Sequence, residues 1–280
     1  MTALVPVLTA AAGVFGLAIG SFLNVVVHRV PAGLSVVRPA SACPGCGHAI
    51  RRRDNVPVVS WLLLGGRCRD CGTAIAARYP LVEAGTAVLF AAVALFLSDS
   101  RFSPVSGVTG PTGAVIVLIV AYSYFMATSV ALALIDIDTH RLPNVLVLPA
   151  FLVLAVLFSA ASALSGDWGA LLRGLVGAVL LAAVYLTLAL LVPGGMGFGD
   201  VKLAGVLGLA TAYLGWGPLA VGSFAAFLLG GTFAIVLMVV RRTGRRTGIP
   251  FGPWMLGGAW IGITLGAPLW DGYVGLLGFP

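Results

Sequence analysis

The chain has 280 residues, of which 60% are hydrophobic and only 9% are charged, and its mean hydropathy is +1.08. A soluble domain carries about 25% charged residues, so this composition excludes an ordinary soluble protein and indicates that lipid is the main solvent. The net charge of +7 does not indicate a nucleic-acid partner, because the sequence contains no basic domain with interleaved aromatic residues.

Apolar runs long enough to cross about 30 Å of hydrocarbon recur along the chain. We expect eight of them to be membrane-spanning helices, at residues 4–27, 81–97, 113–135, 145–164, 170–192, 201–217, 219–240 and 251–270. The first run has no basic residue before it, so we interpret it as a permanent span and not as a signal peptide. The sixth run is the weakest, because it is short and rich in glycine. The sequence therefore predicts an all-α polytopic membrane protein with about eight transmembrane helices.

Arginine residues lie almost entirely in the loops on one side of the predicted spans. These loops contain Arg29, Arg38, Arg51, Arg52, Arg53, Arg67, Arg69, Arg78, Arg141, Arg241, Arg242, Arg245 and Arg246. The opposite side holds only Arg101 and Arg173. Positively charged loops stay in the cytoplasm, so we expect a multi-pass protein of the inner (cytoplasmic) membrane. Its two termini would then lie outside, and the lipid bilayer would be its surroundings.

The one sizeable soluble segment is the loop 28–80, which contains all four cysteines. They form two CxxC pairs, and each pair is followed by a glycine that can adopt the positive φ of a tight turn. The four cysteines are Cys43, Cys46, Cys68 and Cys71. This pattern is typical of a closed tetrahedral metal site. We expect structural Zn²⁺, and iron is a possible alternative for the same ligands.

Two other interpretations of the cysteines are weaker. A pair of disulfides needs an oxidising compartment, whereas the expected topology places the loop in the reducing cytoplasm. Redox chemistry at a single CxxC would leave the second pair unexplained. The predicted organisation is a first span at 1–27, a small cytoplasmic four-cysteine zinc-binding loop domain at 28–80, and a seven-span membrane domain at 81–280.

Three acidic residues lie at the cytoplasmic ends of predicted spans: Asp136 and Asp138 in one sequence stretch and Asp200 in another. Two carboxyl groups that face each other across a small gap share a proton. Such a pair can activate water and protonate a carbonyl, as in aspartic proteases. The blander interpretation is that each aspartate only caps or flanks a helix, and the spacing alone does not decide between the two.

The residues around these acids fit a site that admits a peptide. Gly197 and Gly199 would leave room beside Asp200 for an extended substrate backbone. Pro143 would stop the preceding helix and turn the chain into the next span. Lys202 could steady a carboxylate or reach the interface as an anchor, and the sequence favours neither role.

Six motifs then occur in a fixed order from the first span to the last. They are GSFLNVVVHR (20–29), the paired CxxC segments, RYPLVE (78–83), DIDTHRLPN (136–144), GMGFGDVKL (195–203) and PFGP (250–253). Together they resemble the type IV prepilin peptidases, the bacterial leader peptidases of the GxGD aspartic protease group.

This resemblance implies that Asp136 and Asp200 are the catalytic acids and that Asp138 is only a neighbour. Residues expected to bind substrate or support the site are Gly197, Gly199, Lys202, Pro143, Asn144, Pro250 and Gly252. Asn144 stands where many family members have Asp. The region 81–280 would be a peptidase domain that removes the short basic leader from prepilins or pilin-like pseudopilins at the cytoplasmic face.

The resemblance also implies N-methylation of the new N-terminus with S-adenosylmethionine. The sequence has no Rossmann-type glycine fingerprint for that cofactor, so this expectation rests on the resemblance alone.

Two other functional classes compete with a peptidase. A proton-coupled transporter also uses intramembrane acids, but those acids usually lie near the bilayer midplane at an internal repeat. Here the acids lie at one end of the spans, and the sequence shows no convincing repeat. A non-catalytic membrane scaffold built on a zinc loop would leave the GxGD segment unexplained.

Overall fold

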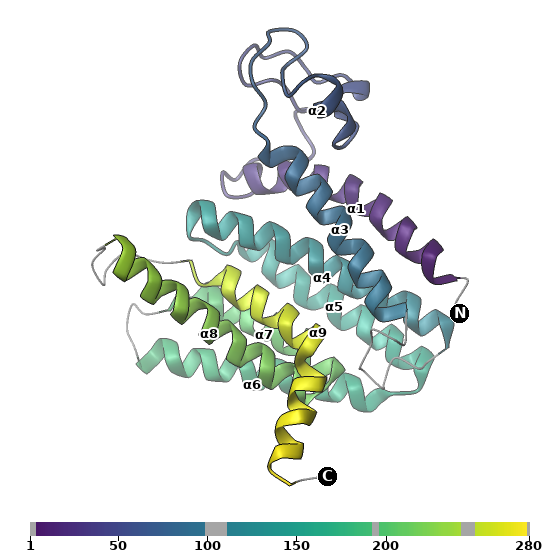
Figure 1. Cartoon of the computed structure of the whole chain (residues 1–280), viewed down its shortest axis with the longest axis vertical. Coiled ribbons are helices and arrows are strands. Elements are labelled where there is room, and N and C mark those ends of the chain that lie inside the picture. Colours follow the sequence, from purple (N-terminus) through teal and green to yellow (C-terminus); the bar gives the residue numbers. More distant parts are fainter. Residues whose placement is uncertain (1–3, 99–110, 192–195, 242–249, 279–280) are drawn as a thin grey trace. The chain divides into compact units, whose positions relative to one another are not determined.

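The computed structural model describes residues 4–98, 111–191, 196–241 and 250–278. The chain forms α1 (Leu4–Arg29), η1 (Arg52–Asn55), α2 (Val59–Leu63), α3 (Arg78–Ser98), α4 (Thr112–Thr139), α5 (Asn144–Ser165), α6 (Trp168–Leu191), α7 (Phe198–Leu214), α8 (Trp216–Arg241) and α9 (Gly252–Leu276) (Figure 1). The described residues contain no β-strand, only two isolated bridges. The predicted all-α class is confirmed.

Long helices lie at all eight predicted spans, with ends shifted by a few residues. Six of them are long and apolar enough to cross a membrane by length and composition, namely α1, α3, α4, α5, α6 and α8. The chain is therefore a multi-pass membrane protein. The weakest predicted span, α7, is the shortest long helix with 17 residues, and for α7 and α9 the crossing itself stays a prediction.

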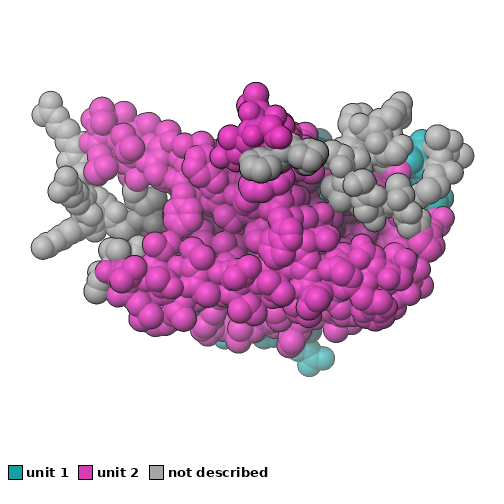
Figure 2. Space-filling view, turned by 90° about the horizontal axis from the view of Figure 1, so that it is seen from below, with its two compact units in different colours: residues 1–95 teal, residues 96–280 magenta. Residues whose placement is uncertain are grey.

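The chain divides into two compact units, residues 1–95 and 96–280, coloured separately in Figure 2. In the first unit, α1 and α3 approach closely because α1 carries glycine at the contact. A Cβ on Gly20 would lie 2.7 Å from the Cα of Glu83. The Asn24 side chain also donates a hydrogen bond of 3.2 Å to the Tyr79 carbonyl. Glycine therefore permits a backbone contact that any larger residue would prevent.

A buried acid joins α3 to the loop in this first unit. The Glu83 carboxylate accepts a hydrogen bond of 2.6 Å from the Val58 N–H. Val58 has φ +60°, and the next N–H, of Val59, donates to the Pro57 carbonyl at 2.6 Å. This is a γ-turn of the rare positive-φ kind, which is strained at a β-branched residue. The Glu83 contact therefore helps hold a strained turn at the start of α2.

In the second unit, the main helix pairs are α6 with α7 and α8 with α9. A Cβ on Gly177 of α6 would overlap Ala212 and lie 2.9 Å from the Gly208 carbonyl of α7. In the other pair, a Cβ on Gly258 of α9 would lie 2.6 Å from the Gly222 carbonyl of α8. Glycine at these crossings gives the close van der Waals packing that holds membrane helices together.

Helix α7 runs alongside α5 in the same direction. Near its start, the Lys202 ammonium donates to the Asn144 side chain at the start of α5, at 2.9 Å. Near its end, the Tyr213 and Ser162 hydroxyls are 3.1 Å apart. Arg173 of α6 donates to the Ala212 and Tyr213 carbonyls, both at 2.7 Å. The guanidinium thus satisfies carbonyl groups that the helix end leaves without partners.

These crossings predict a matched pair of glycine substitutions. Gly177→Ala adds a Cβ where the α7 backbone lies, so we expect it to lower the free energy of unfolding by about 1–3 kcal/mol. Gly231→Ala places a Cβ on α8 with nothing within 4 Å, and we expect it to be neutral or stabilising by up to about 1 kcal/mol. Unfolding in detergent would measure both, and equal stability of the two variants would contradict the close α6–α7 contact.

Candidate active site and metal centre

Asp136 lies in the last turn of α4. The helix ends at Thr139, and His140 caps it in the left-handed conformation with φ +53°, its N–H bonded to the Asp136 carbonyl at 2.9 Å. Successive helix positions rotate by about 100°, so neighbours in this turn face different surroundings. Asp136 is 5% exposed, whereas Asp138 lies on the exposed face. The structure thus separates the two acids that the sequence places together.

The start of α9 meets the Asp136 carboxylate. The Gly252 N–H donates a hydrogen bond of 3.0 Å to Asp136 Oδ2. A Cβ on Gly252 would lie 2.8 Å from the same oxygen, so a side chain here would displace the carboxylate. The glycine of the PFGP motif is therefore required by a close approach between residues 116 positions apart in the chain.

Asp200 is in the first turn of α7. Its Oδ2 accepts a hydrogen bond of 3.1 Å from the Gly197 N–H at the N-cap. This contact satisfies a backbone donor at the helix start, where a negative charge is also favoured by the helix dipole. Asp200 is thus a helix-capping residue, as the blander interpretation of the sequence expects. Capping uses one carboxylate oxygen and leaves the other for further contacts.

Leu142, in the turn between α4 and α5, brings the two aspartates into one site. A Cβ on Gly199, next to Asp200, would lie 3.1 Å from Leu142. A Cβ on Gly252, which binds Asp136, would lie 3.2 Å from the same side chain. The Asp136 and Asp200 carboxyl groups are close enough to interact electrostatically. The C-terminal end of α4 and the N-terminal ends of α7 and α9 therefore meet around one leucine.

The other predicted support residues lie at this end of the unit. Pro143 is the N-cap of α5 with φ −66°, whereas the preceding helix already ends at Thr139 with His140 as its cap, so Pro143 begins the next span without being the residue that stops α4. Asn144 and Lys202 form the hydrogen bond that joins α5 to α7. Pro250 lies two residues before Gly252, at the start of α9. The space beside Gly199 is filled by Leu142, whereas Gly197 is exposed.

Two side chains at the site have no clear signal in the sequence. Leu142 is one leucine among many. Tyr185 of α6 is 1% exposed and interacts electrostatically with Asp200. Its ring centroid lies 6.4 Å from that of Phe251, which precedes Gly252. A tyrosine within an apolar span was a weak pointer, because its hydroxyl needs a partner when buried.

In the first unit, the four cysteines gather around one point. Their Sγ atoms all lie within 4.8 Å of one another, and those of Cys43 and Cys71 are 3.7 Å apart. None of the four forms a disulfide. The group could hold one metal ion.

The two CxxC turns have the same backbone pattern. The Cys43 N–H bonds to the His48 carbonyl, and the Gly47 N–H bonds back to the Cys43 carbonyl. The second turn has the same two hydrogen bonds. The Cys68 N–H donates to the Thr73 carbonyl, and the Gly72 N–H donates to the Cys68 carbonyl. The glycines have φ of +73° and +72°, as predicted. Each turn therefore presents two sulfurs in the same direction.

The surroundings of the cluster shift the pKa values of its thiols in both directions, because burial and the neighbouring thiols raise the pKa of Cys46 to about 12. Hydrogen bonds with the Thr73 side chain and backbone lower the pKa of the Cys71 thiol to about 6. The Arg69 guanidinium binds both Asp54 oxygens, at 2.7 to 3.1 Å, and this bond lowers the pKa of Asp54. Arg69 follows Cys68 in the chain, so this ion pair ties the second cysteine turn to η1.

Comparison with known proteins finds two family models that match this chain. The model of the bacterial peptidase A24 N-terminal domain matches residues 14–97, and that of the type IV leader peptidase family matches residues 123–235. No solved structure matches the chain.

Several curated relatives extend over nearly the whole chain. A protein of Pseudomonas aeruginosa is 36% identical over 94% of this chain and 92% of its own length. A protein of Pseudomonas putida is 37% identical over 96% of this chain and 94% of its own length. A protein of Aeromonas salmonicida is 35% identical over 90% of this chain and 89% of its own length. Each of the three is named prepilin leader peptidase/N-methyltransferase. By this similarity over at least 90% of its length, the chain belongs to the type IV leader peptidase family.

Proposed function

We propose that this chain is a membrane aspartic endopeptidase that removes the leader from prepilin-like substrates, with Asp136 and Asp200 as its catalytic pair. The observation that supports the pair is the meeting of two aspartates from separate helices around Leu142. Each carboxylate is held by the N–H of a motif glycine, Gly252 or Gly197. The relatives' name supports the substrate class.

The chemistry follows from two carboxyl groups that share a proton. The ionised aspartate removes a proton from water, and the resulting hydroxide adds to the carbon of the scissile carbonyl. The protonated aspartate donates its proton to the carbonyl oxygen. The tetrahedral intermediate then collapses: the first aspartate gives the proton it took from water to the amide nitrogen, a hydroxyl of the intermediate returns a proton to the second aspartate, and the C–N bond breaks. The pair is left with one proton, ready for the next cycle.

The backbone contacts suit this chemistry. Gly252 and Gly197 each donate to an Oδ2 atom, which fixes the orientation of both carboxyl groups and leaves the Oδ1 atoms to face water and substrate. Room for the peptide backbone would come from the exposed side at Gly197. The Gly199 side is filled by Leu142 and cannot supply it.

The Lys202–Asn144 hydrogen bond has a positioning role in this proposal. Lys202 lies two residues after Asp200, and Asn144 lies just beyond the turn that carries Leu142. Their bond of 2.9 Å therefore ties the helix of one aspartate to the turn that follows the other. An Asp at position 144 would accept the same hydrogen bond from Lys202, so either Asn or Asp suits this position.

We also propose that the aspartates face the cytoplasm. The ends of α4, α5, α7 and α9 that form the site belong to the side on which the arginine residues concentrate. The basic leader of a prepilin stays on this side when its apolar helix enters the membrane. The arginine-rich segment at 242–249 lies outside the described residues.

For the cysteine cluster we propose zinc. Zn–S bonds of about 2.3 Å in a tetrahedron place neighbouring sulfurs about 3.8 Å apart, and the Cys43–Cys71 distance of 3.7 Å fits this geometry. Four protein ligands leave no open position, so the ion would stabilise the fold of the loop. It takes no part in the hydrolysis.

The second activity in the relatives' name, N-methylation, is also part of the proposal. It would transfer a methyl group from S-adenosylmethionine to the amine that hydrolysis releases. The described residues contain no strand and thus no Rossmann-type turn for that molecule, so we assign none of them to it. The competing transporter function is not supported, because the curated relatives described above carry the peptidase name.

The catalytic pair is tested by Asp-to-Asn substitutions. Asp136→Asn and Asp200→Asn keep an oxygen that can accept the glycine N–H but cannot shuttle a proton. We expect each to lower the rate of cleavage of a prepilin-like peptide by at least about 10²–10⁴, with unchanged thermal stability in detergent. Asp138→Asn is the matched control and should keep most of the activity. Full activity of the Asp200→Asn protein would refute the pair.

The metal is tested by elemental analysis of purified protein. We expect about one zinc ion per chain, lost in Cys43→Ser and retained in the control Ser41→Ala. Because metal binding and folding are coupled in small sites, a chelator should expose residues 30–77 to protease before α4–α9 unfold. A metal-free protein with a protease-resistant loop would contradict the proposal.

Orientation is tested by reporter fusions. A reporter after Gly65 should read cytoplasmic, and reporters after Gly166 and Gly215 should read external, because α5 and α7 run in the same direction from the site. A cytoplasmic signal at Gly215 would show that α7 does not cross the membrane.

A further inference from the structure

Among the described residues of the second unit, one buried tyrosine has a hydroxyl without a protein partner. The Tyr122 hydroxyl donates to the Ala210 carbonyl at 2.7 Å, and the Tyr213 hydroxyl pairs with Ser162 at 3.1 Å. Tyr185 is 1% exposed, yet its hydroxyl has no hydrogen bond to any described residue. A buried hydroxyl without a partner is costly and uncommon. The hydroxyl oxygens that are both fully enclosed and without a partner among the described residues are those of Thr9 and Ser123. The Tyr185 oxygen is not one of them, so it has accessible space beside it that a partner outside the chain can occupy.

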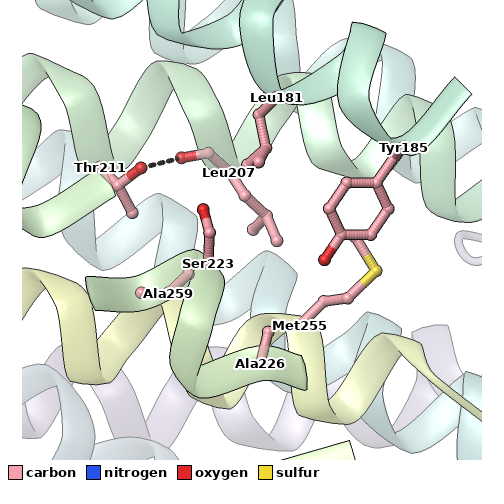
Figure 3. A pocket seen from close by; sticks show the side chains of 9 residues that line it. Leu181, Tyr185, Leu207, Thr211, Ser223, Ala226, Met255 and Ala259 are labelled. Atoms are coloured by element: carbon pink, nitrogen blue, oxygen red, sulfur yellow. Dashed lines mark hydrogen bonds between the residues drawn. The ribbon is translucent and has the colours of Figure 1, made fainter. Parts of the chain in front are cut away.

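The Tyr185 ring lines a small cavity between α6, α7, α8 and α9 (Figure 3). Two more hydroxyls line it, those of Thr211 and Ser223. Both donate within their own helices, to Leu207 at 2.7 Å and to Leu219 at 2.6 Å. Their protons are used, so their oxygens can only accept further hydrogen bonds. The Tyr185 hydroxyl, by contrast, can donate.

We infer that this cavity is a binding site for water. A buried water makes about three hydrogen bonds, and the cavity offers one donor, at Tyr185, and two acceptors, at Thr211 and Ser223. The other lining side chains are apolar, among them Leu181 and Met255. Water both accepts and donates, so it can satisfy all three hydroxyls, whereas a hydrocarbon chain would satisfy none.

The cavity lies next to the proposed catalytic site, because Tyr185 contributes to both. Tyr185 lines the cavity and interacts electrostatically with Asp200, and it also packs against Phe251 beside Gly252. Hydrolysis consumes one water per bond cleaved, and a substrate bound at the exposed side of Gly197 would separate the aspartates from bulk water. The water site would supply the molecule that the aspartates activate. This second step rests on the proposed function, whereas the water site itself does not.

Radiolytic hydroxyl labelling tests the site directly, because bound water generates radicals beside buried side chains. Met255 lines the cavity and is 1% exposed, and Met126 of α4 is an internal control that is 6% exposed and does not line it. We expect Met255 to be oxidised about tenfold faster than Met126 despite its deeper burial.

Ser223→Val, which fills the cavity, and Thr211→Val, which removes an acceptor without changing shape, should each slow oxidation of Met255. Equal labelling of the two methionines in the native protein would overturn the water site.

Cleavage kinetics test the supply of water. Tyr185→Phe removes the donor and keeps the ring, so we expect kcat to fall about tenfold with KM unchanged. Tyr122→Phe is the matched control, because it removes a buried hydroxyl that does not line the cavity, and it should lower stability but not kcat. If Met255 is oxidised faster than Met126 but Tyr185→Phe keeps its full kcat, the cavity still binds water, and the proposal that this water is supplied to the aspartates is overturned. Failure of the proposed function would appear separately, as activity in Asp200→Asn.

Discussion

Close contact between helix backbones is the constraint on which the second unit depends. Lipid is as apolar as a leucine side chain, so burial of apolar surface does not hold membrane helices together, and packing must do so. At the α6–α7 and α8–α9 crossings, glycine lets the chains approach to distances at which any Cβ would collide. These contacts fix where α7 and α9 begin. Gly197 and Gly252 therefore present their N–H groups to Asp200 and Asp136.

The first unit is held by different forces, because its loop is polar. Its cysteine turns are shaped by backbone hydrogen bonds and positive-φ glycines, and ion pairs such as Arg69 with Asp54 join the turns to η1. Glu83 ties the loop to α3 through a strained turn at Val58. In both units a carboxylate near a helix end accepts a backbone N–H at the start of another helix, from Val58 before α2 and from Gly252 at the start of α9.

The sequence predicted the helices well, because apolar runs of membrane length have few alternatives. The cysteine turns were also predictable, since CxxC followed by glycine restricts the local backbone. The resemblance to the family distinguished Asp136 from Asp138, but the spacing of the residues could not, because only helix rotation buries one and exposes the other. Leu142 and Tyr185 were not found, because their importance comes from contacts between distant residues. The bond between Gly252 and Asp136 likewise joins segments that no local pattern connects.

The contact of Arg173 with the end of α7 has a consequence for the surrounding membrane. A helix of 17 residues is about 26 Å long, shorter than the roughly 30 Å of a typical hydrocarbon core. Because the guanidinium holds the last carbonyls of α7, a cation and its water are fixed at that depth. With α7 crossing the membrane as predicted, the bilayer would thin locally or flanking polar side chains would reach toward the interface, at a modest free-energy cost per ångström of hydrophobic mismatch. Acyl-chain length would thus act on the position of α7, and through α7 on the depth of Asp200 in the membrane.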